Sequence, residues 1–418
     1  MIVVKILIIF LSLLTEQSYC KEYFDVDQIR LKNGASVVTL SADWGSDTEL
    51  ASLLIKNGGA LKFDRKTSFP VLAFKLLNYK LQRLANEYGF IVKGTFTWDY
   101  SSFIFYFPKG FLENNNTVLW DTVFSRNDVD PIELENIKMD VLRLLKKDLN
   151  RKFSRMSLLS LMSPNSSVYS LGVYGNEEDL KSITENEFAE FLKCYLNPLG
   201  AVFVVTGLDK SSIQVVSKEL EKKKPCFRDQ KSYVEALNSL NVPVRKINYT
   251  KASGSNSVVR IGFPSASCTA KESFTYDLVQ QLINDDKGFS SLGWSIYVSN
   301  NCTVAGGVIE IVIGGLKKAD IDQILKQVFK MFSALSKNID DNSMSLSKER
   351  LATKYADRIS KREELVLLTA RTSFLYGDPD FVFKYIKKIN DVKLYEVRKV
   401  LSELTERNSY IVLIRMGN

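Results

Sequence analysis

The feature that most constrains the fold of this chain is an internal repeat. Residues 184–207 read TENEFAEFLKCYLNPLGAVFVVTG, which predicts a helix opened by a Thr-x-x-Glu capping box and followed by an apolar strand. Residues 391–417 read DVKLYEVRKVLSELTERNSYIVLIRMG, which gives the same order of a capped amphipathic helix, a short polar turn and an apolar strand. The two halves of the chain are therefore expected to end in the same way.

The two halves also begin alike. The segments ELASLLIKNGGALKFDRKTSFPVLAFKLLN and NSVVRIGFPSASCTAKESFTYDLVQQLIND each predict a strand, a polar loop and a helix. Leu53 and Val204, in an early strand and the terminal strand of one half, lie 151 residues apart, and Val259 and Val412 in the other half lie 153 residues apart. Two unrelated domains would not keep that register, so we infer a duplicated unit.

Each half is predicted to be α+β. Between Leu53 and Val204 of the first half, the segment TFTWDYSSFIFYF predicts two strands around a tight turn. Phe103, Phe105 and Phe107 are expected on one face. A helix follows with Asp130 as its cap and Pro131 at its first position. We therefore expect two duplicated units, each a mainly antiparallel sheet with helices packed on one side.

The length of 418 residues suits two domains of about 200 residues each. The stretch between the halves is charged and rich in turn residues. We place the N-terminal unit at residues 21–228, a linker at residues 229–246 and the C-terminal unit at residues 247–418.

Residues 1–20, MIVVKILIIFLSLLTEQSYC, are predicted to be an export signal. Lys5 precedes an apolar run, and Ser18 and Cys20 are small residues before a plausible cleavage point. An uncleaved anchor is the weaker interpretation, because about 20 apolar residues are needed to span a bilayer. The mature protein is expected in the periplasm or outside the cell, with no membrane association beyond the signal.

Four cysteines remain after the predicted cleavage, at positions 194, 226, 268 and 302. They form no C-x-x-C pair, which argues against a structural zinc site. In an oxidising compartment they allow two disulfides, most simply one in each half, although three pairings are possible. Free buried thiols are an equally good interpretation.

The composition excludes several kinds of chemistry. The chain has no histidine, so a serine or cysteine nucleophile has no histidine base and a zinc ion has no imidazole ligand. The P-loop, dinucleotide-binding and G-x-S-x-G motifs are also absent. The net charge of +8 is spread along the chain without a basic cluster interleaved with aromatic residues, so we expect no nucleic-acid partner.

Four segments together resemble one known family. They are LKNGASVV, IKNGGAL, YGNEEDLKSITENEFAEFLKCYLNP followed by AVFVVTG, and LYGDPDFVFKYIKKINDVKLYEV. This order of elements resembles the pitrilysin/insulinase family, the inverzincin peptidases, over nearly the whole mature chain. The resemblance implies that two α+β units make one subunit and that two subunits enclose a peptide-binding chamber.

The same resemblance implies that the catalytic site has been lost. Family members that cut peptides carry H-x-x-E-H on the first helix of the N-terminal unit, where two histidines hold zinc and the glutamate is the base. Here the pentad falls on LAFKL, with Leu72 and Leu76 at the histidine positions and Lys75 at the glutamate position. The third ligand falls at Leu144. Because leucine offers no lone pair and lysine repels a cation, we expect no metal, no cofactor and no enzymatic activity of its own.

A tyrosine and an arginine that contact bound peptide are a further feature of the family's C-terminal unit. Tyr297 matches the tyrosine, but no arginine precedes it within ten residues. The resemblance thus implies a noncatalytic subunit that binds peptides and pairs with a histidine-bearing pitrilysin-type partner, as a heterodimer, or with itself, as a homodimer. The alternatives are a structural or interaction protein that keeps the fold, and a peptidase that uses other metal ligands.

Overall fold

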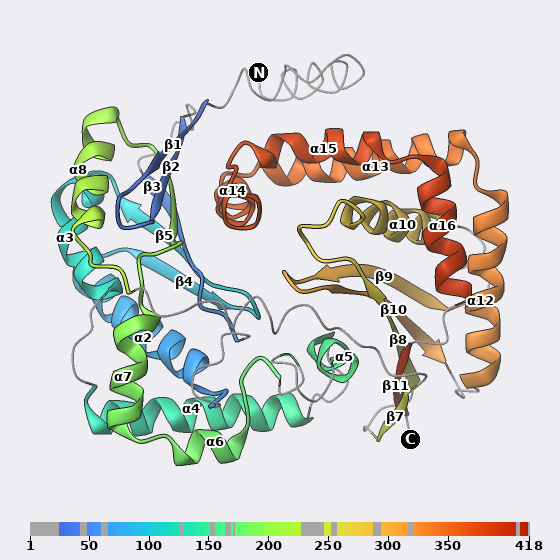
Figure 1. Ribbon diagram of the computed structural model, residues 1–418, viewed down its shortest axis with the longest axis horizontal. Coiled ribbons are helices and arrows are strands. Elements are labelled where there is room, and N and C mark those ends of the chain that lie inside the picture. Colours follow the sequence, from blue (N-terminus) through green and yellow to red (C-terminus); the bar gives the residue numbers. More distant parts are fainter. Residues whose placement is uncertain are drawn as a thin grey trace.

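The computed structural model describes residues 25–41, 48–59, 66–124, 129–150, 155–163, 169, 172–226, 246–251, 257–286, 294–316, 321–406 and 410–416. The predicted export signal and all but the last residue of the predicted linker lie outside the described residues. The described chain forms two β-sheets, each with helices on its outer side, which face each other across the molecule (Figure 1).

The first sheet has six strands in the order β1-β2-β6-β3-β5-β4. Neighbouring strands are antiparallel except for β2 and β6, which are parallel, so the sheet is mixed. The strands are β1 (Asp25–Arg30), β2 (Ser36–Ser41), β3 (Thr48–Ile55), β4 (Ile91–Phe96), β5 (Ser101–Pro108) and β6 (Val202–Thr206).

The described part of the first half contains the three predicted helices and four others. They are α2 (Phe69–Tyr88), α3 (Phe111–Val123), α4 (Pro131–Asn150), α5 (Arg155–Met162), α6 (Glu177–Ser182), α7 (Glu185–Tyr195) and α8 (Lys210–Glu221). The predicted capping box of α7 is confirmed, because the Thr184 hydroxyl accepts the backbone N–H of Glu187 and the Glu187 carboxylate accepts the backbone N–H of Thr184. The carboxylate of Asp130 likewise accepts the backbone N–H of Ile132 at 2.9 Å, at the start of α4.

The second sheet has five strands in the order β7-β11-β8-β10-β9, of which only β7 and β11 are parallel. The strands are β7 (Lys246–Lys251), β8 (Ser257–Ser265), β9 (Ser295–Cys302), β10 (Gly307–Leu316) and β11 (Ile411–Met416). The helices of this half are α10 (Ser273–Asp285), α12 (Ile321–Asn338), α13 (Asp341–Ile359), α14 (Arg362–Tyr376), α15 (Phe381–Asp391) and α16 (Leu394–Glu406).

The second sheet repeats five strands of the first. In chain order, β7, β8, β9, β10 and β11 take the places of β2, β3, β4, β5 and β6, with the same neighbours and the same directions. The connecting helices correspond as well: α2 and α10 each join the second strand of the repeat to the third, and α7 and α16 each precede the last strand. This topology supports the duplication inferred from the sequence.

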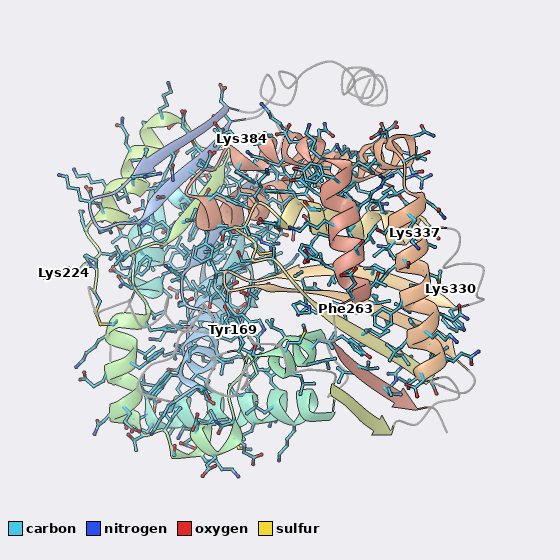
Figure 2. All side chains as sticks on the ribbon, turned by 45° about the vertical axis from the view of Figure 1, so that its right-hand side comes forward. Tyr169, Lys224, Phe263, Lys330, Lys337 and Lys384 are labelled. Atoms are coloured by element: carbon cyan, nitrogen blue, oxygen red, sulfur yellow. A yellow bond between two sulfur atoms is a disulfide. The ribbon has the colours of Figure 1, made fainter. Side chains whose placement is uncertain are left out.

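Successive side chains along a strand point to opposite faces of its sheet. In β5, the predicted face of Phe103, Phe105 and Phe107 is confirmed, because all three lie in the core beneath α2 and α3. In the second half, Phe263 lies in a separate core with α10, α12 and α16, whereas Lys330 and Lys337 on α12 point outward (Figure 2).

The prediction of helices on one side of each sheet is incomplete. The opposite face of the first sheet is covered by α14 of the second half, whose Leu365 and Val366 pack with Val38 and Val204. The opposite face of the second sheet is covered in part by α5 of the first half, where Leu158 packs with residues of β10 and β11. Each half therefore supplies one helix to the other half's sheet, and α14 lies between the two halves in Figure 1.

Two disulfides, Cys194–Cys226 and Cys268–Cys302, join cysteines within each half. This is the simplest of the pairings that the sequence allows. Such bonds persist in oxidising compartments, which favours an extracytoplasmic protein. Among the described residues, no helix has both the length and the apolar composition required to cross a membrane.

Candidate functional site

Helix α2 carries the positions at which the sequence predicts a lost zinc motif. Leu72 and Leu76 are fully buried in the first core, one turn apart on the same face. Lys75 lies between them in the chain and is half-buried. Pro70 stands in the first turn, as predicted, and Gly89 ends the helix in the left-handed region at φ 71°. This face of α2 packs as an apolar surface.

Leu144 lies on α4, a helix that packs against α2. Its side chain is half-buried, whereas Val141 and Leu145 on the same helix belong to the first core. The described residues contain no cluster of three or more histidine, cysteine, aspartate or glutamate side chains that could hold a metal ion. The assignment of Leu72, Lys75, Leu76 and Leu144 to former ligand positions remains a prediction from the sequence.

Strand β4, next to α2, forms one edge of the first sheet. Lys93, Gly94 and Thr95 in this strand are exposed. The side-chain amide of Gln82 on α2 donates to the carbonyl of Val92 at 2.8 Å, so this carbonyl points away from β5. By the alternation of an antiparallel ladder, the N–H and C=O of Gly94 also point away from β5, toward solvent. This edge can accept an added strand.

Strand β9 is the corresponding edge of the second sheet, but side chains of α10 cover its backbone. The amide of Asn284 bonds both the N–H and the C=O of Val298, each at 2.9 Å. The side-chain oxygen of Gln280 accepts the N–H of Asn300 at 2.7 Å. These residues satisfy the backbone groups that an incoming strand would need, so the two sheet edges differ in their capacity to bind peptide.

Tyr297 lies on β9 and is 54% exposed. The strand register places Tyr297, Val312 and Arg260 opposite one another on β9, β10 and β8, so the three side chains share one face of the sheet. Arg260 forms an ion pair with Glu310, whose side chain is fully buried. The sequence alone does not place this arginine near Tyr297, because Arg260 lies on β8, which β10 separates from β9 in the sheet. An arginine amid the apolar residues of β8 is the signal that could have identified it.

The tips of two hairpins meet where the halves join. Asp99, in the turn between β4 and β5, is buried and accepts hydrogen bonds from the Tyr169 hydroxyl at 3.0 Å and from the N–H of Val304 at 3.1 Å. Val304 lies in the turn between β9 and β10. Burial raises the pKa of the Asp99 carboxyl to about 6, against the lowering effect of the two hydrogen bonds and of the Arg371 guanidinium. A titratable group therefore sits at the junction of the two halves.

Three solved structures have the same architecture along almost their whole length. A protease from Helicobacter pylori matches with a TM-score of 0.77 and 14% sequence identity, covering 94% of this chain and 100% of that one. The inactive domain of an M16 peptidase from Pseudomonas fluorescens matches with a TM-score of 0.78 and 13% identity, covering 94% and 98%. The chain has the M16 peptidase fold. The fold predicted from the pitrilysin-like motifs is thus confirmed.

A putative M16-like peptidase from Alicyclobacillus acidocaldarius matches this M16-like chain with a TM-score of 0.75 and 14% identity, covering 94% of this chain and 99% of that one. No family model matches the sequence, and no curated protein matches it. At such low identity, the likeness establishes the fold.

Proposed function

We propose that this chain is a noncatalytic subunit of an exported M16-type assembly, in which it forms part of a peptide-binding chamber with a zinc-bearing partner. One observation carries the proposal: the M16 fold is intact, but Leu72 and Leu76 are fully buried where the family's zinc histidines are expected. A catalytic zinc needs about three ligands with lone pairs, which leucine cannot supply. Hydrolysis by the assembly would then depend on the partner.

The exposed edge of β4 is the proposed place of peptide contact. An extended peptide would pair with the outward N–H and C=O of Gly94, which gives affinity without a demand on peptide sequence. Tyr297 and Arg260 would contribute from the inner face of the second sheet. The covered edge of β9 would not take part, because Asn284 and Gln280 already occupy its backbone groups.

Copurification and peptide cleavage test the proposed assembly. Tagged chain, purified from the cells that make it, should bring down a relative that contains H-x-x-E-H, and the pair should cleave peptides that the chain alone leaves intact. A chain that is a stable monomer without such a partner would instead be a structural or interaction protein. Stoichiometric zinc in the purified chain, with cleavage by the chain alone, would contradict the loss of the metal site.

Hydrogen exchange tests the proposed peptide contact. A bound peptide should slow exchange of the Gly94 amide, because this N–H becomes a donor to the added strand. The amides of Val298 and Asn300 serve as the internal control, since side chains of α10 already satisfy them. Slower exchange of the β9 amides without slower exchange at β4 would show that the peptide binds at β9, and would refute this part of the proposal.

A further inference from the structure

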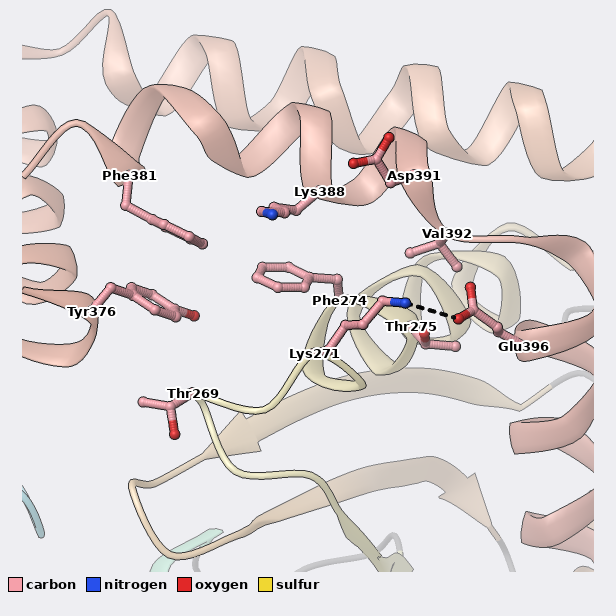
Figure 3. A pocket seen from close by; sticks show the side chains of 10 residues that line it. All are labelled: Thr269, Lys271, Phe274, Thr275, Tyr376, Phe381, Lys388, Asp391, Val392 and Glu396. Atoms are coloured by element: carbon pink, nitrogen blue, oxygen red, sulfur yellow. Dashed lines mark ion pairs between the residues drawn. The ribbon is translucent and has the colours of Figure 1, made fainter. Parts of the chain in front are cut away.

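A cavity of about 280 Å³ lies in the second half, between α10, α15 and the beginning of α16 (Figure 3). Three aromatic side chains line it: Phe274 of α10, Tyr376 at the end of α14 and Phe381 at the start of α15. The rings of Tyr376 and Phe381 stack with centroids 3.8 Å apart, and those of Phe274 and Phe381 with centroids 6.0 Å apart. The cavity therefore has an aromatic wall.

Two ammonium groups and two carboxylates also line the cavity. Lys271 faces Glu396 at 3.7 Å, a loose ion pair, and the Lys271 side chain is 85% exposed. Lys388 and Asp391 belong to the last turn of α15 and also line the cavity. Among the described residues, Lys388 forms no ion pair. In Figure 3 the two ammonium groups stand on either side of Phe274. The four charges sum to zero: Lys271 and Glu396 contact each other, whereas Lys388 and Asp391 are exposed to solvent.

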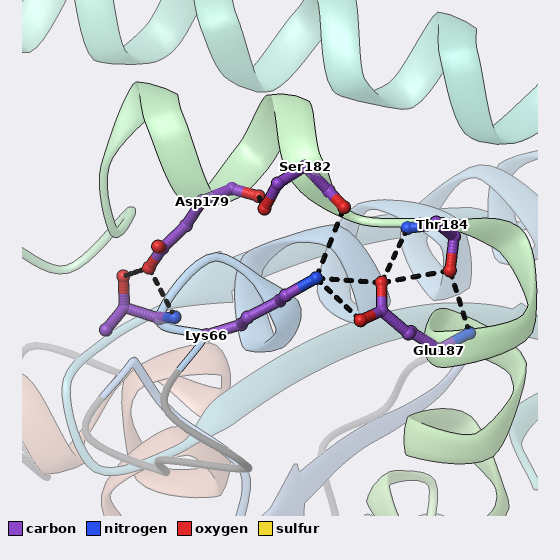
Figure 4. Close-up of polar contacts among 6 residues, drawn as sticks. Lys66, Asp179, Ser182, Thr184 and Glu187 are labelled. Carbon is purple, nitrogen blue, oxygen red and sulfur yellow. Dashed lines mark hydrogen bonds and ion pairs between the residues drawn. The ribbon is translucent and has the colours of Figure 1, made fainter.

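The corresponding place in the first half has an equivalent ion pair with a shorter distance between the charged groups. Lys66 precedes α2 as Lys271 precedes α10, and it contacts Glu187 at 2.7 Å (Figure 4). Glu187 closes the capping box of α7, and Glu396 accepts the N–H of Lys393 at the start of α16 in the same way. The repeat has therefore kept a lysine and a capping glutamate at this position in both halves.

The packing around the two ion pairs differs. In the first half, Phe69 of α2 stacks on Phe188 and Phe191 of α7, with ring centroids 6.3 and 4.9 Å apart, and all three are buried. At the same distances along the chain from the capping glutamate, α16 carries Val397 and Val400. Smaller side chains fill less space between the helices. The ring of Phe274 packs toward α15 instead, against Phe381 and beside the cavity.

We propose that this cavity binds a free amino acid with an apolar side chain, of the leucine or phenylalanine class. The aromatic wall of Phe274, Phe381 and Tyr376 would take the side chain, and Lys388 with Lys271 would take the carboxylate. The ligand's ammonium would face Asp391 and Glu396. The cavity is slightly smaller than the sites of drug-sized ligands, which span about 300–1,000 Å³, and so suits a molecule of this size.

The charge pattern selects a zwitterion over simpler ligands. A plain carboxylate would meet Asp391 and Glu396 without compensation, and a plain amine would meet the two lysines. An uncharged apolar molecule would remove the ionic groups from water without pairing them, which is unfavourable. Only a ligand with both charges pairs with both sets of groups. This site does not depend on the proposed peptidase-like role.

Calorimetric titration of the purified chain with L-leucine and L-phenylalanine tests the proposal. We expect a dissociation constant of about 1 mM or tighter. L-Leucinamide lacks the carboxylate, and N-acetyl-L-leucine lacks the ammonium, so each should bind at least about tenfold more weakly because one charge-assisted contact is lost. Absence of heat with both amino acids far above this concentration, or equal binding of all the analogues, would overturn the proposal.

Two variants test which residue binds the carboxylate of the ligand and which binds its ammonium group. Lys388→Met should weaken leucine binding about tenfold and remove the preference for leucine over leucinamide. Asp391→Asn should remove the preference for leucine over N-acetyl-leucine. Lys387→Met, on the exposed side of the same helix and outside the cavity, is the matched control and should bind as the parent does. Unchanged preferences in the first two variants would show that leucine binds elsewhere and refute the site.

Discussion

At the scale of single residues, the most informative positions are those at which a polar group is expected and an apolar group is found. Leu72 and Leu76 are fully buried on the core-facing side of α2. Their apolar stripe continues through Leu77 and Leu81 into the same core. The two leucines are thus integrated into the packing, and their contribution to stability can be measured.

Leu72→Ala should lower the free energy of unfolding by about 2–5 kcal/mol, because it removes buried methyl groups and leaves a cavity. Tyr79→Ala, at an exposed position of the same helix, should change it by less than about 1 kcal/mol. Urea unfolding of the two variants beside the parent gives both values. Equal losses would contradict the placement of Leu72 in the core.

Asp99 should make the stability of the protein depend on pH. Its pKa is about 6 when folded, above the value of about 3.9 for an unfolded aspartate. The folded state therefore binds more protons between these values, and the contribution of this group is full below about pH 4 and lost as the pH rises through about 6. The loss is about 3 kcal/mol at most.

Urea unfolding from pH 4.5 to 7.5 measures this dependence. The Asp99→Asn variant, which cannot ionise, should show a flatter profile than the parent over this range. The hydrogen bond from Val304 N–H can still reach the amide oxygen, so the variant is expected to fold. Parallel profiles for parent and variant would mean that another group carries the pH dependence.

At the scale of helices and strands, the sequence predicts well whatever depends on local pattern. The capping box at Thr184, the first-turn proline of α2 and the apolar face of β5 are all found as predicted, because each depends on residues a few positions apart. The placement of α5 and α14 on the opposite half's sheet could not be predicted. It depends on contacts between residues far apart in the chain, which periodicity does not specify.

The site was predictable to a lesser degree for the same reason. A family motif located the apolar positions on α2, since they lie within one pentad. The position of Arg260 and Tyr297 on one face of the sheet depends on strand register, and the coverage of β9 by Asn284 depends on how closely α10 packs against that strand. Neither the strand register nor the packing of the helix on the strand is encoded in the local spacing of residues.

The contact of α5 with the second sheet depends on a glycine. A Cβ atom at Gly262 of β8 would lie 3.1 Å from Cδ2 of Leu158 and 3.2 Å from Cγ1 of Val308. Gly262→Val should therefore destabilise the protein by about 1–3 kcal/mol through crowding. Gly314→Val in β10 is the control, because a Cβ there would lie 3.8 Å from its nearest neighbour.

A double-mutant cycle locates the crowding. Adding Leu158→Ala to Gly262→Val should recover part of the loss, because the smaller side chain makes room for the valine. Thermal unfolding of the four proteins of the cycle gives the interaction energy. Strict additivity of the two changes would show that α5 does not pack against Gly262.

At the scale of the whole molecule, the two repeats form one structure. Arg362 at the start of α14 donates to the carbonyl of Thr48 at 2.7 Å and to the hydroxyl of Thr206, and the helix it opens covers the first sheet. Leu158 and Trp98 of the first half pack with Ile411 and Leu413 of the second. Two of the chain's buried apolar clusters thus contain residues from both halves.

Residues 21–228 and residues 247–418, produced separately, should therefore fail to fold alone. Each would expose the sheet face that a helix of the other half covers, and large exposed apolar faces lead to aggregation. The intact chain should unfold in a single cooperative transition. Circular dichroism and sedimentation of each half, with coexpression of both halves as the control that should restore a soluble complex, provide the comparison. Soluble, cooperatively unfolding separate halves would mean that the exchanged helices α5 and α14 contribute little to folding.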